Sequence, residues 1–574
     1  MELLLLLQKT LIFLMQQIIE CVPNFSEGND LSIIKQITNE IEITEGVKLL
    51  DVDPGKATNR TVVTFVGTPE AVIDAAFRAI KKAAELIDMS KHTGEHPRMG
   101  ATDVCPLIPV SNISMEETAA FARRLAERVG SELNIPTYLY EAAQPNPSRN
   151  NLSVIRAGEY EGFFKKIKLP EWKPDFGPSV MPEKAGATVI GARDFLIAYN
   201  VNLNTKSTRL ANSIAFDIRE NGRVKRKGNP ITGEVELDAQ GEPVRVPGLL
   251  KACKAIGWFI EEYDIAQVSI NLTNYNITSI HKCFDACCGS ADKRGLRVTG
   301  SELVGLIPLK ALTDAGEYYL KKQGRSIGVS EKEKIHIAVK SLGLDNLGPF
   351  DASKKIIEYV LRDAKHAPLV NMKLSTFVNE TASESAAPGG GSVSAAIGAL
   401  GAALGTMVAN LSAAKRGWEE KSSAFSDWAD RGQKIKDRLL YLVDEDTASF
   451  NAVMLAYSMP KTTAEEKATR SEAIEKANLY ATQIPLEVMD TAHGALPLIL
   501  AMVTLGNQNG ISDAGVGALC LQTAVEGAYL NVRINAKDLK DRMAAQQLME
   551  QGKQLSDSTK IRLQEILKVV HDIL

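Results

Sequence analysis

The stretch ATVIGARDFLIAYNVNL, residues 187–203, is rich in β-branched and aromatic side chains and indicates β-structure. Similar runs flank it at Ile18–Val22, Val47–Val52, Thr61–Val66, Val104–Val110 and Ala266–Leu272. Between them, two segments carry apolar residues at helical spacing: Pro69–Ile87, opened by Thr68-Pro69, and Ser114–Val129, opened by Ser114 with Glu117 three residues on. The pattern from Ile18 to about Leu342 therefore predicts a layered α/β or α+β fold.

The character of the chain changes beyond Gly343, where strand-like runs end and Ala, Leu, Lys, Glu and Gln dominate as far as Leu574. This composition predicts a helical domain. The run VCPLIPV at Val104 is similar to VGLIPLK at Val304. Two related lobes would produce this similarity, but so could chance. A chain of 574 residues is too long to fold around one hydrophobic core. We therefore predict a multidomain protein of two α/β (α+β) lobes followed by an all-α helical bundle. The expected divisions are an apolar extension at 1–16, lobes at 17–195 and 196–345, a linker at 346–373, and the helical domain at 374–574.

The charge balance bears on the kind of partner. With 66 Lys and Arg against 70 Asp and Glu, the net charge is −4, and no basic excess is present to neutralise a phosphate backbone. The chain is 45% hydrophobic and 24% charged, as ordinary globular proteins are. We therefore expect small molecules as partners and no nucleic acid.

The seven cysteines do not suggest a disulfide framework, because their number is odd and the chain is long. Cys283, Cys287 and Cys288 lie near His281 in the sequence and could form a metal cluster. However, HKCFDACC lacks two separated CxxC pairs and has a helical pattern. Reduced core thiols are the simpler interpretation, and no metal is expected.

Two apolar segments raise the question of a membrane. Met1–Gln16 lacks a basic start and a small-residue cleavage site, so it is either an interfacial anchor or an upstream extension, with translation starting at Met15. Ser394–Ala413 is nearly uncharged and long enough to span a bilayer. Because it is rich in small residues and its neighbours lack aromatic belts, we interpret it as a helix buried in a bundle or dimer. No membrane span is expected.

The segment Arg219–Gly248 is rich in charged residues, Gly and Pro, and its NPITGE and AQGEP runs indicate turns. Its Arg and Lys cluster is followed at once by Glu and Asp, which favours a solvated loop over a nucleic-acid site. We expect a surface excursion or a flexible hairpin.

The segment KHTGEHPRMGATDVCPLIPV, Lys91–Val110, holds two of the seven histidines of the chain. His92 and His96 are four residues apart, but the glycines and proline around them argue for a loop, not for a zinc-binding helix. A loop histidine near Arg98 suits proton transfer at neutral pH together with binding of a carboxylate. Residue types alone leave a structural or surface histidine equally open.

A glycine-rich turn occurs in AAPGGGSVSAAIGAL, Ala386–Leu400, where three glycines precede Ser392 and a predicted helix. Backbone amides at a helix start can bind an anionic group. No lysine follows the glycines and no strand leads into them, so the Walker and dinucleotide patterns both fail. The alternative interpretation is a flexible hinge into the helix.

The segment YLVDEDTASFNAV, Tyr441–Val453, places three consecutive acids in an apolar helix. Asp444 and Asp446 point to different faces, since positions two apart do not align on a helix. A buried carboxylate is costly unless it is paired or functional, so this helix is a candidate site. A solvated face is the alternative.

Longer motifs occur along the whole chain. The first half contains ECVPNFSEG at Glu20, LLDVDPG at Leu49, NRTVVTFVG at Asn59, GEHPRMGATDVCP at Gly94, IRAGEYEG at Ile155, DFGPS at Asp175 and GATVIGARDFLIAYNVNL at Gly186. The second half contains SAAPGGGSVSAAIGALGAAL, LVDEDTASFNAVMLAYSMPK and GAYLNVRINAKDLKD. These motifs resemble those of the formiminotransferase-cyclodeaminase family, the transferase part over residues 17 to about 345 and the cyclodeaminase part over about 374–574.

The resemblance implies particular site residues. His96 matches the catalytic histidine of the transferase part, and Asp446 matches the catalytic aspartate of the cyclodeaminase part. Arg98 is the expected clamp for a substrate carboxylate. The folate-binding residues expected are Gly177, Pro178, Ser179, Gly186, Gly389, Gly390, Gly391 and Ser392. The middle of the segment Gly177–Gly186 and the length of the excursion at 219–248 depart from the family pattern.

The resemblance also implies a function. It is that of a bifunctional folate enzyme of histidine degradation, which transfers a formimino group between N-formimino-L-glutamate and tetrahydrofolate. The enzyme then cyclises 5-formiminotetrahydrofolate to 5,10-methenyltetrahydrofolate with release of ammonia. We expect polyglutamylated tetrahydrofolate as co-substrate, no metal, a cytoplasmic location and a homo-oligomer of at least two chains. The alternative is a monofunctional glutamate formiminotransferase with a helical oligomerisation domain.

Overall fold

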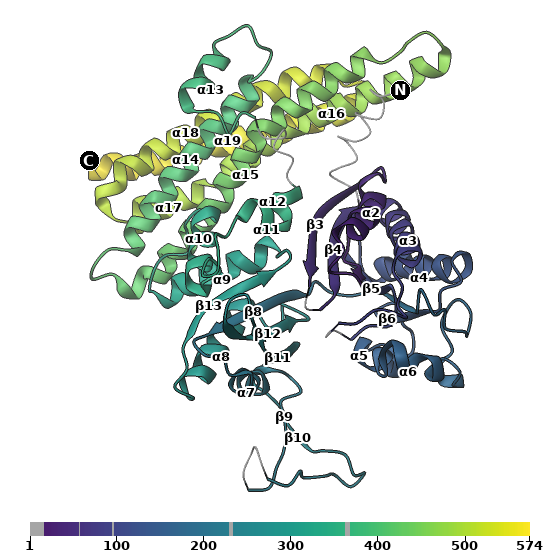
Figure 1. Cartoon of the computed structure of the whole chain (residues 1–574). Coiled ribbons are helices and arrows are strands. Elements are labelled where there is room, and N and C mark those ends of the chain that lie inside the picture. The colour runs from purple at the N-terminus through teal and green to yellow at the C-terminus, as the bar shows by residue number, and fades with distance from the viewer. Residues whose placement is uncertain (1–16, 57, 95–96, 229–232, 362–367) are drawn as a thin grey trace. The chain divides into compact units, whose positions relative to one another are not determined.

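The computed structural model describes residues 17–56, 58–94, 97–228, 233–361 and 368–574 (Figure 1). These residues group into two compact units. The sheet unit comprises the described residues of 17–311 and 342–360, and the helical unit those of 312–341 and 361–574. The apolar extension expected at 1–16 lies outside the described residues.

The sheet unit contains a seven-stranded sheet in the order β1-β4-β2-β5-β7-β6, with β3 paired to β4. Its strands are β1 (Ile18–Cys21), β2 (Asn24–Phe25), β3 (Val47–Gly55), β4 (Arg60–Gly67), β5 (Thr102–Ser111), β6 (Thr137–Glu141) and β7 (Thr188–Ala192). The β5–β7 and β6–β7 pairs are parallel, whereas β4 pairs antiparallel with β1, β2 and β3.

Helices α2 (Leu31–Glu42), α3 (Pro69–Leu86) and α4 (Met115–Glu132) accompany this sheet. Thr68 caps α3 by accepting a hydrogen bond from the Ala71 N–H, with Pro69 in the first turn. Ser114 and Glu117 form a capping box at the start of α4. Both predicted helix starts are confirmed.

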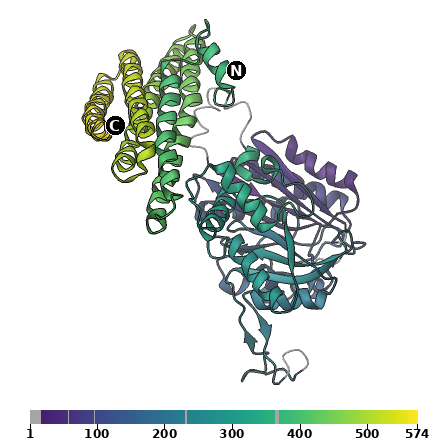
Figure 2. The ribbon, with the colours of Figure 1, turned by 90° about the vertical axis from the view of Figure 1, so that its left-hand side faces the viewer.

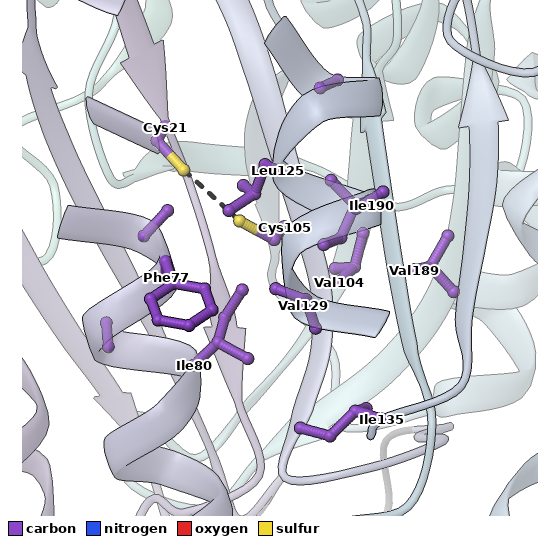
Figure 3. Packing of buried hydrophobic residues seen from close by; sticks show 14 of the residues in the cluster. Cys21, Phe77, Ile80, Val104, Cys105, Leu125, Val129, Ile135, Val189 and Ile190 are labelled. Carbon is purple, nitrogen blue, oxygen red and sulfur yellow. Dashed lines mark hydrogen bonds between the residues drawn. The ribbon is translucent and has the colours of Figure 1, made fainter. Parts of the chain in front are cut away.

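The core of this lobe is built between the sheet and helices α3 and α4. Figure 3 shows the sulfurs of Cys21 on β1 and Cys105 on β5, 3.5 Å apart, near Phe77 of α3 and Leu125 of α4. Burial raises the pKa of the Cys21 thiol well above its ordinary value. All seven cysteines are free in the structure, and five of them are buried.

Residues 187–203 form two strands, and these strands belong to two different sheets. β7 (Thr188–Ala192) belongs to the first sheet, and β8 (Ile197–Leu203) belongs to a four-stranded antiparallel sheet in the order β11-β12-β8-β13. The other strands of this second sheet are β11 (Cys253–Ile260), β12 (Ile265–Leu272) and β13 (Val298–Val304). Helix α7 (Thr208–Ile218) packs on β11 and β12, and α8 (Ile280–Asp292) packs on α7. The prediction of two α/β lobes is confirmed.

The predicted surface excursion at 219–248 is a hairpin-like arm. Its base is the antiparallel pair β9 (Arg223–Val224) and β10 (Arg245–Val246), and single bridges continue it at Arg226–Val235 and Leu237–Pro243. Figure 2 shows the arm extending from the second lobe. The sheet unit also contains the short helices α5 (Leu152–Arg156), α6 (Glu159–Lys166), α11 (Ala352–Lys355) and α12 (Ile357–Leu361). The last residue of α12, Leu361, is assigned to the helical unit.

The helical unit confirms the predicted all-α domain. Its helices are α13 (Leu374–Thr381), α14 (Gly390–Ala413), α15 (Glu419–Ser458), α16 (Ala464–His493), α17 (Leu496–Leu505), α18 (Ile511–Asn535) and α19 (Arg542–Ile573). Small residues let α14 and α18 approach closely, because a Cβ on Gly401 would lie 2.8 Å from the Gly517 carbonyl oxygen. Among the described helices, α14 and the stretch Ala464–Leu505 are long and apolar enough to cross a membrane, and 61% and 56% of their most apolar windows are buried inside the protein.

The helical unit also includes a piece of chain that precedes the linker. This piece contains most of α9 (Leu309–Lys322) and of α10 (Glu331–Leu342). Lys334 of α10 is buried and pairs with Glu317 of α9 at 2.6 Å and with Asp430 of α15 at 2.8 Å. The Ile327 N–H donates to the Ser426 hydroxyl at 2.9 Å. Residues 312–341 therefore pack on α15 as part of this unit.

Candidate functional site

Two of the three consecutive acids on α15 anchor other parts of the helical unit. Asp444 accepts hydrogen bonds from the backbone N–H groups of Leu369 at 2.8 Å and Val370 at 3.2 Å. Glu445 accepts a hydrogen bond from the phenol of Tyr480 on α16. Both carboxylates are thus engaged in contacts within the unit, and they do not form a freely solvated face.

The third acid, Asp446, is held by the first turn of α14. Its Oδ2 accepts hydrogen bonds from the Ser392 N–H at 2.8 Å and from the Ser392 hydroxyl at 3.0 Å. The Ser392 hydroxyl also lies 3.2 Å from that of Thr447. N-terminal amides of a helix have no partner within the helix and carry partial positive charge, so this position stabilises the carboxylate. The glycine-rich turn and the acidic helix, which the sequence analysis treated separately, form one site.

The glycine turn packs directly against the carboxylate. A Cβ on Gly391 would lie 2.1 Å from Oδ1 of Asp446, and a Cβ on Gly390 would lie 3.2 Å from Nδ2 of Asn531. Gly389 faces open space. Gly391 is therefore required for a close approach, and the contact supports a built site more than a flexible hinge.

The electrostatics of Asp446 combine two opposing effects. Burial raises the pKa of its carboxyl above the ordinary aspartate value, and the two bonds from Ser392 lower it without cancelling that effect. Burial also raises the pKa of Asp444, against the bonds from Leu369 and Val370. A carboxyl with a raised pKa exchanges a proton more readily near neutral pH than a surface aspartate does.

Sequence reasoning missed Asn531 at this site. Asn531 lies on α18 and donates through Nδ2 to the Gly527 carbonyl at 2.9 Å, beside Gly390. It belongs to the motif GAYLNVRINAKDLKD, which supported the family resemblance without singling out any residue. The sequence feature that could have identified Asn531 is a polar side chain in a helix rich in small residues, α18.

The second candidate site lies in the sheet unit, on the loop that leads into β5. His96 lies outside the described residues, so its catalytic role stays a prediction. Arg98 is 9% exposed and pairs with Glu161 at 2.6 Å and with Glu159 at 3.1 Å. Protein carboxylates therefore occupy its guanidinium, and its role as clamp for a substrate carboxylate stays a prediction.

His92 ties this loop to the turn before β4. Its Nε2 lies 2.9 Å from the Asn59 carbonyl oxygen, which can only accept, and its Nδ1 lies 3.3 Å from Nε of Arg98, which can only donate. These partners fix a neutral imidazole with its proton on Nε2. Nδ2 of Asn59 donates in turn to the Thr93 carbonyl at 2.8 Å. His92 is thus a structural residue, and both of its ring nitrogens are occupied.

Asp103 fixes the other end of the loop. It is fully buried, pairs with Arg60 at 2.6 Å and Arg156 at 2.7 Å, and accepts from the Met99 N–H at 3.1 Å. Burial lowers the pKa of Arg60 to about 10, although Asp103 opposes the shift. This carboxylate is therefore the charge partner of two arginines that have little contact with water.

The expected folate segment reaches the loop at one end only. Gly186 has a φ of +69° and forms a bridge with Gly100, and a Cβ on Gly186 would lie 2.4 Å from the Met99 carbonyl oxygen. Gly177 packs instead on Gly130, near the end of α4. Pro178 is half-buried and Ser179 is exposed. The structure brings Gly186 together with the loop and leaves Gly177 apart from it.

Among the described residues, no group of three or more His, Cys, Asp and Glu side chains is arranged to hold a metal ion. The buried Cys283 thiol contacts those of Cys253 and Cys287, and the hydrogen bond with Cys283 together with burial raises the pKa of Cys253 well above its ordinary value.

The fold and these sites define a multidomain α/β-plus-helical protein with a buried carboxylate held by a glycine turn in the helical unit and an ion-paired loop before β5 in the sheet unit. Models of the formiminotransferase domain match residues 18–193, as its N-terminal subdomain, and residues 198–362. A model of formiminotransferase-cyclodeaminase matches residues 373–554.

Comparison with curated proteins identifies relatives of the whole chain and of parts of it. Formimidoyltransferase-cyclodeaminase of Mus musculus is 44% identical over 528 residues, which cover 92% of this chain and 94% of that protein. Glutamate formimidoyltransferase of Streptococcus pyogenes serotype M1 is 41% identical over 54% of this chain and 94% of its own length. Methenyltetrahydrofolate cyclohydrolase of Methylorubrum extorquens is 36% identical over 32% of this chain and 87% of its own length. The chain belongs to the formimidoyltransferase-cyclodeaminase family.

Proposed function

We propose that this chain catalyses two consecutive reactions of one folate-bound carbon. The first transfers a formimino group between N-formimino-L-glutamate and tetrahydrofolate. The second cyclises 5-formiminotetrahydrofolate to 5,10-methenyltetrahydrofolate and releases ammonia. The observation that carries the proposal is the 44% identity to a formimidoyltransferase-cyclodeaminase over 92% of the chain. The built site around Asp446 supports it independently.

In the transferase reaction, N5 of tetrahydrofolate attacks the formimino carbon of N-formimino-L-glutamate, and the bond from that carbon to the glutamate nitrogen breaks. We propose that His96 takes the proton that N5 loses and gives a proton to the departing glutamate amine. Arg98 orients a substrate carboxylate. The carboxylates that occupy Arg98 have side chains 44% and 65% exposed at Glu159 and Glu161, so a substrate can replace them at small cost. The residues Gly177, Pro178, Ser179 and Gly186 contribute folate contacts.

In the cyclodeaminase reaction, N10 attacks the formimino carbon within the same molecule, and the C–N bond to the departing nitrogen breaks. Holding N10 near the carbon supplies much of the acceleration. Asp446 carries the proton from N10 toward the leaving nitrogen, or stabilises the cationic amidine as a fixed anion. The turn Gly389–Ser392 positions that carboxylate and borders the bound folate.

Further properties are part of the same proposal. The co-substrate is polyglutamylated tetrahydrofolate, and the chain works in the cytoplasm, where seven free thiols are stable. We propose a homo-oligomer of at least two chains. Exposed apolar side chains on two adjacent helices support self-association: Leu400 and Leu411 on α14, and Val516 and Leu519 on α18, are 46–60% exposed.

The decisive experiment supplies the purified chain with N-formimino-L-glutamate and tetrahydrofolate, and follows ammonia and the methenyl product together. Equal amounts of both are expected. Glutamate formation without ammonia favours the monofunctional transferase with a helical oligomerisation domain. Methenyl product that disappears by hydrolysis shows instead the activity for which the Methylorubrum extorquens relative is named.

Replacing Gly391 by alanine is expected to lower the rate of ammonia release by about 10- to 100-fold, a size typical of a small displacement at a reacting group. The added Cβ would lie 2.1 Å from Oδ1 of Asp446, so either the turn or the carboxylate must move. Gly289→Ala on α8 is the control for an added methyl group, because Gly289 faces open space and lies outside the proposed folate-binding residues. Equal rates for the two variants would contradict the close-approach argument.

The pH dependence of cyclodeamination provides another prediction. Asp446 acts as the anion, and burial raises its pKa, so the rate is expected to fall with decreasing pH at a higher pH than an ordinary aspartate near 4 would give. A rate profile measured from pH 4 to 8 on supplied 5-formiminotetrahydrofolate tests this. An acid limb at or below pH 4 would contradict it.

A further inference from the structure

We propose that Asp444 is a positioning residue for the cyclodeaminase reaction. It fixes one end of a segment whose other end packs against Asp446. The inference rests on the proposed function of Asp446 and extends that site to Asp444, whose carboxylate accepts hydrogen bonds from the backbone N–H groups of Leu369 and Val370.

The segment from Leu369 to Ser392 contacts α15 at both of its ends. At its first end, the N–H groups of Leu369 and Val370 donate to Asp444. At its last end, the N–H and hydroxyl of Ser392 donate to Asp446, two residues further along the same helix. The segment is therefore a closed loop, with both ends held by neighbouring carboxylates.

Between these ends, Met372 and Phe377 are the described hydrophobic side chains that pack against the core of the unit. Helix α13 buries no side chain, and Leu374 and Val378 are 77% and 55% exposed. Figure 1 shows α13 standing out from the bundle formed by α14 to α19. The hydroxyls of Thr381 and Ser383 donate to carbonyls within the segment itself. Phe377 is half-buried against the core of the unit.

The first end is well built for anchoring. Leu369 is 5% exposed and belongs to the core of the helical unit. Asp444 is 9% exposed, so its two bonds to the backbone form away from most of the solvent. Two hydrogen bonds to one ionised group are stronger than two bonds between neutral partners. The start of the loop is thus held by packing and charge together.

The last end needs this anchoring because it tolerates little displacement. The Gly391 backbone is so close to Asp446 that a single added carbon atom would overlap the carboxylate. When one end of a closed loop is released, the other end samples more positions. A displacement of about 1 Å at a reacting group can cost on the order of 100-fold in rate. Releasing Leu369 and Val370 from Asp444 therefore loosens the turn that holds Asp446.

The test compares three substitutions in the full chain with wild type, using 5-formiminotetrahydrofolate as substrate. In Asp444→Asn, the side-chain amide offers one acceptor where the carboxylate offers two, so one backbone N–H loses its partner. We expect kcat for ammonia release to fall about tenfold with KM changed less than about twofold, because positioning acts on the chemical step. Asp444→Glu keeps two acceptors and is expected to recover part of the loss. Asp437→Asn is the matched control on the same helix, since its side chain is 50% exposed and pairs with Lys436, and it should match wild type.

A fourth substitution leaves Asp444 unchanged and alters one of its backbone donors. Val370→Pro removes one of the two N–H donors and is expected to lower kcat in the same direction, by a smaller factor. Formimino transfer should stay at the wild-type level in all variants and reports that the sheet unit is folded, and circular dichroism reports the folding of the helical unit.

Two results would overturn the role of Asp444. One is a wild-type kcat in both Asp444→Asn and Val370→Pro. The other is a loss of activity that equals the loss of folded protein measured by circular dichroism, with kcat per folded molecule unchanged, because a purely structural brace gives that pattern. If the wild-type chain itself releases no ammonia, the proposed function fails, and this outcome is separate from a variant that matches an active wild type.

Discussion

Asp446→Asn is expected to reduce ammonia release from 5-formiminotetrahydrofolate by about 100- to 10,000-fold, the range typical of losing a group that transfers a proton. Asparagine has nearly the same shape, and its oxygen can still accept a hydrogen bond from Ser392. It carries no negative charge and cannot take up a proton. The change therefore removes the chemistry of the carboxylate while the contact with α14 survives.

The measurement follows methenyltetrahydrofolate and ammonia in single-substrate assays, with formimino transfer as the internal control. Transfer should be unchanged, because Asp446 lies in the helical unit and the transferase residues lie in the sheet unit. If the variant forms methenyltetrahydrofolate at the wild-type rate, the catalytic assignment of the helical unit is wrong. The monofunctional alternative would then be favoured.

Asp103→Ala is expected to destabilise the sheet unit by about 3–5 kcal/mol and to abolish formimino transfer. Asp103 is the charge partner of Arg60 and Arg156, whose side chains are only 12% and 13% exposed. Its removal leaves two positive charges close together with little access to water, and it also frees the Met99 N–H. The loop that carries the predicted catalytic histidine loses its fixed end.

Urea unfolding followed by circular dichroism and by residual transfer activity measures this effect. Asp74→Ala is the matched control: Asp74 also pairs with two arginines, Arg78 and Arg128, but its side chain is 32% exposed and theirs are 48% and 36% exposed. Exposed pairs contribute about 0–1 kcal/mol, so this control should keep both stability and activity. Similar losses for the two variants would show that the burial of Asp103 is not what makes it important.

Local signals in the sequence predicted local structure well. The cap of Thr68 and the capping box of Ser114 and Glu117 are properties of a few consecutive residues, and both helices begin where these signals stand. The strand signal of residues 187–203 was also correct, but it did not reveal that the chain changes sheets there. Propensity describes single residues, whereas sheet membership depends on partners far along the chain.

The candidate site shows the same limit. The glycine turn and the acidic helix were each recognised from the sequence, yet their contact joins residues 54 positions apart. Nothing in a single sequence specifies that Asp444, Glu445 and Asp446 would each select a different partner. The contribution of Asn531 was missed for the same reason, because its proximity to Gly390 arises only when α14 and α18 pack.

The burial of Lys334 between Glu317 and Asp430 has a consequence for dividing the chain. The formiminotransferase model extends to residue 362, yet residues 312–341 pack with the helices that follow it. The boundary between the two family models in the sequence is therefore not the boundary between the compact units. A gene truncated after residue 362 would encode a fragment in which Lys334 lacks Asp430, so cutting the chain where one family model ends and the next begins removes contacts that α9 and α10 make within their own compact unit.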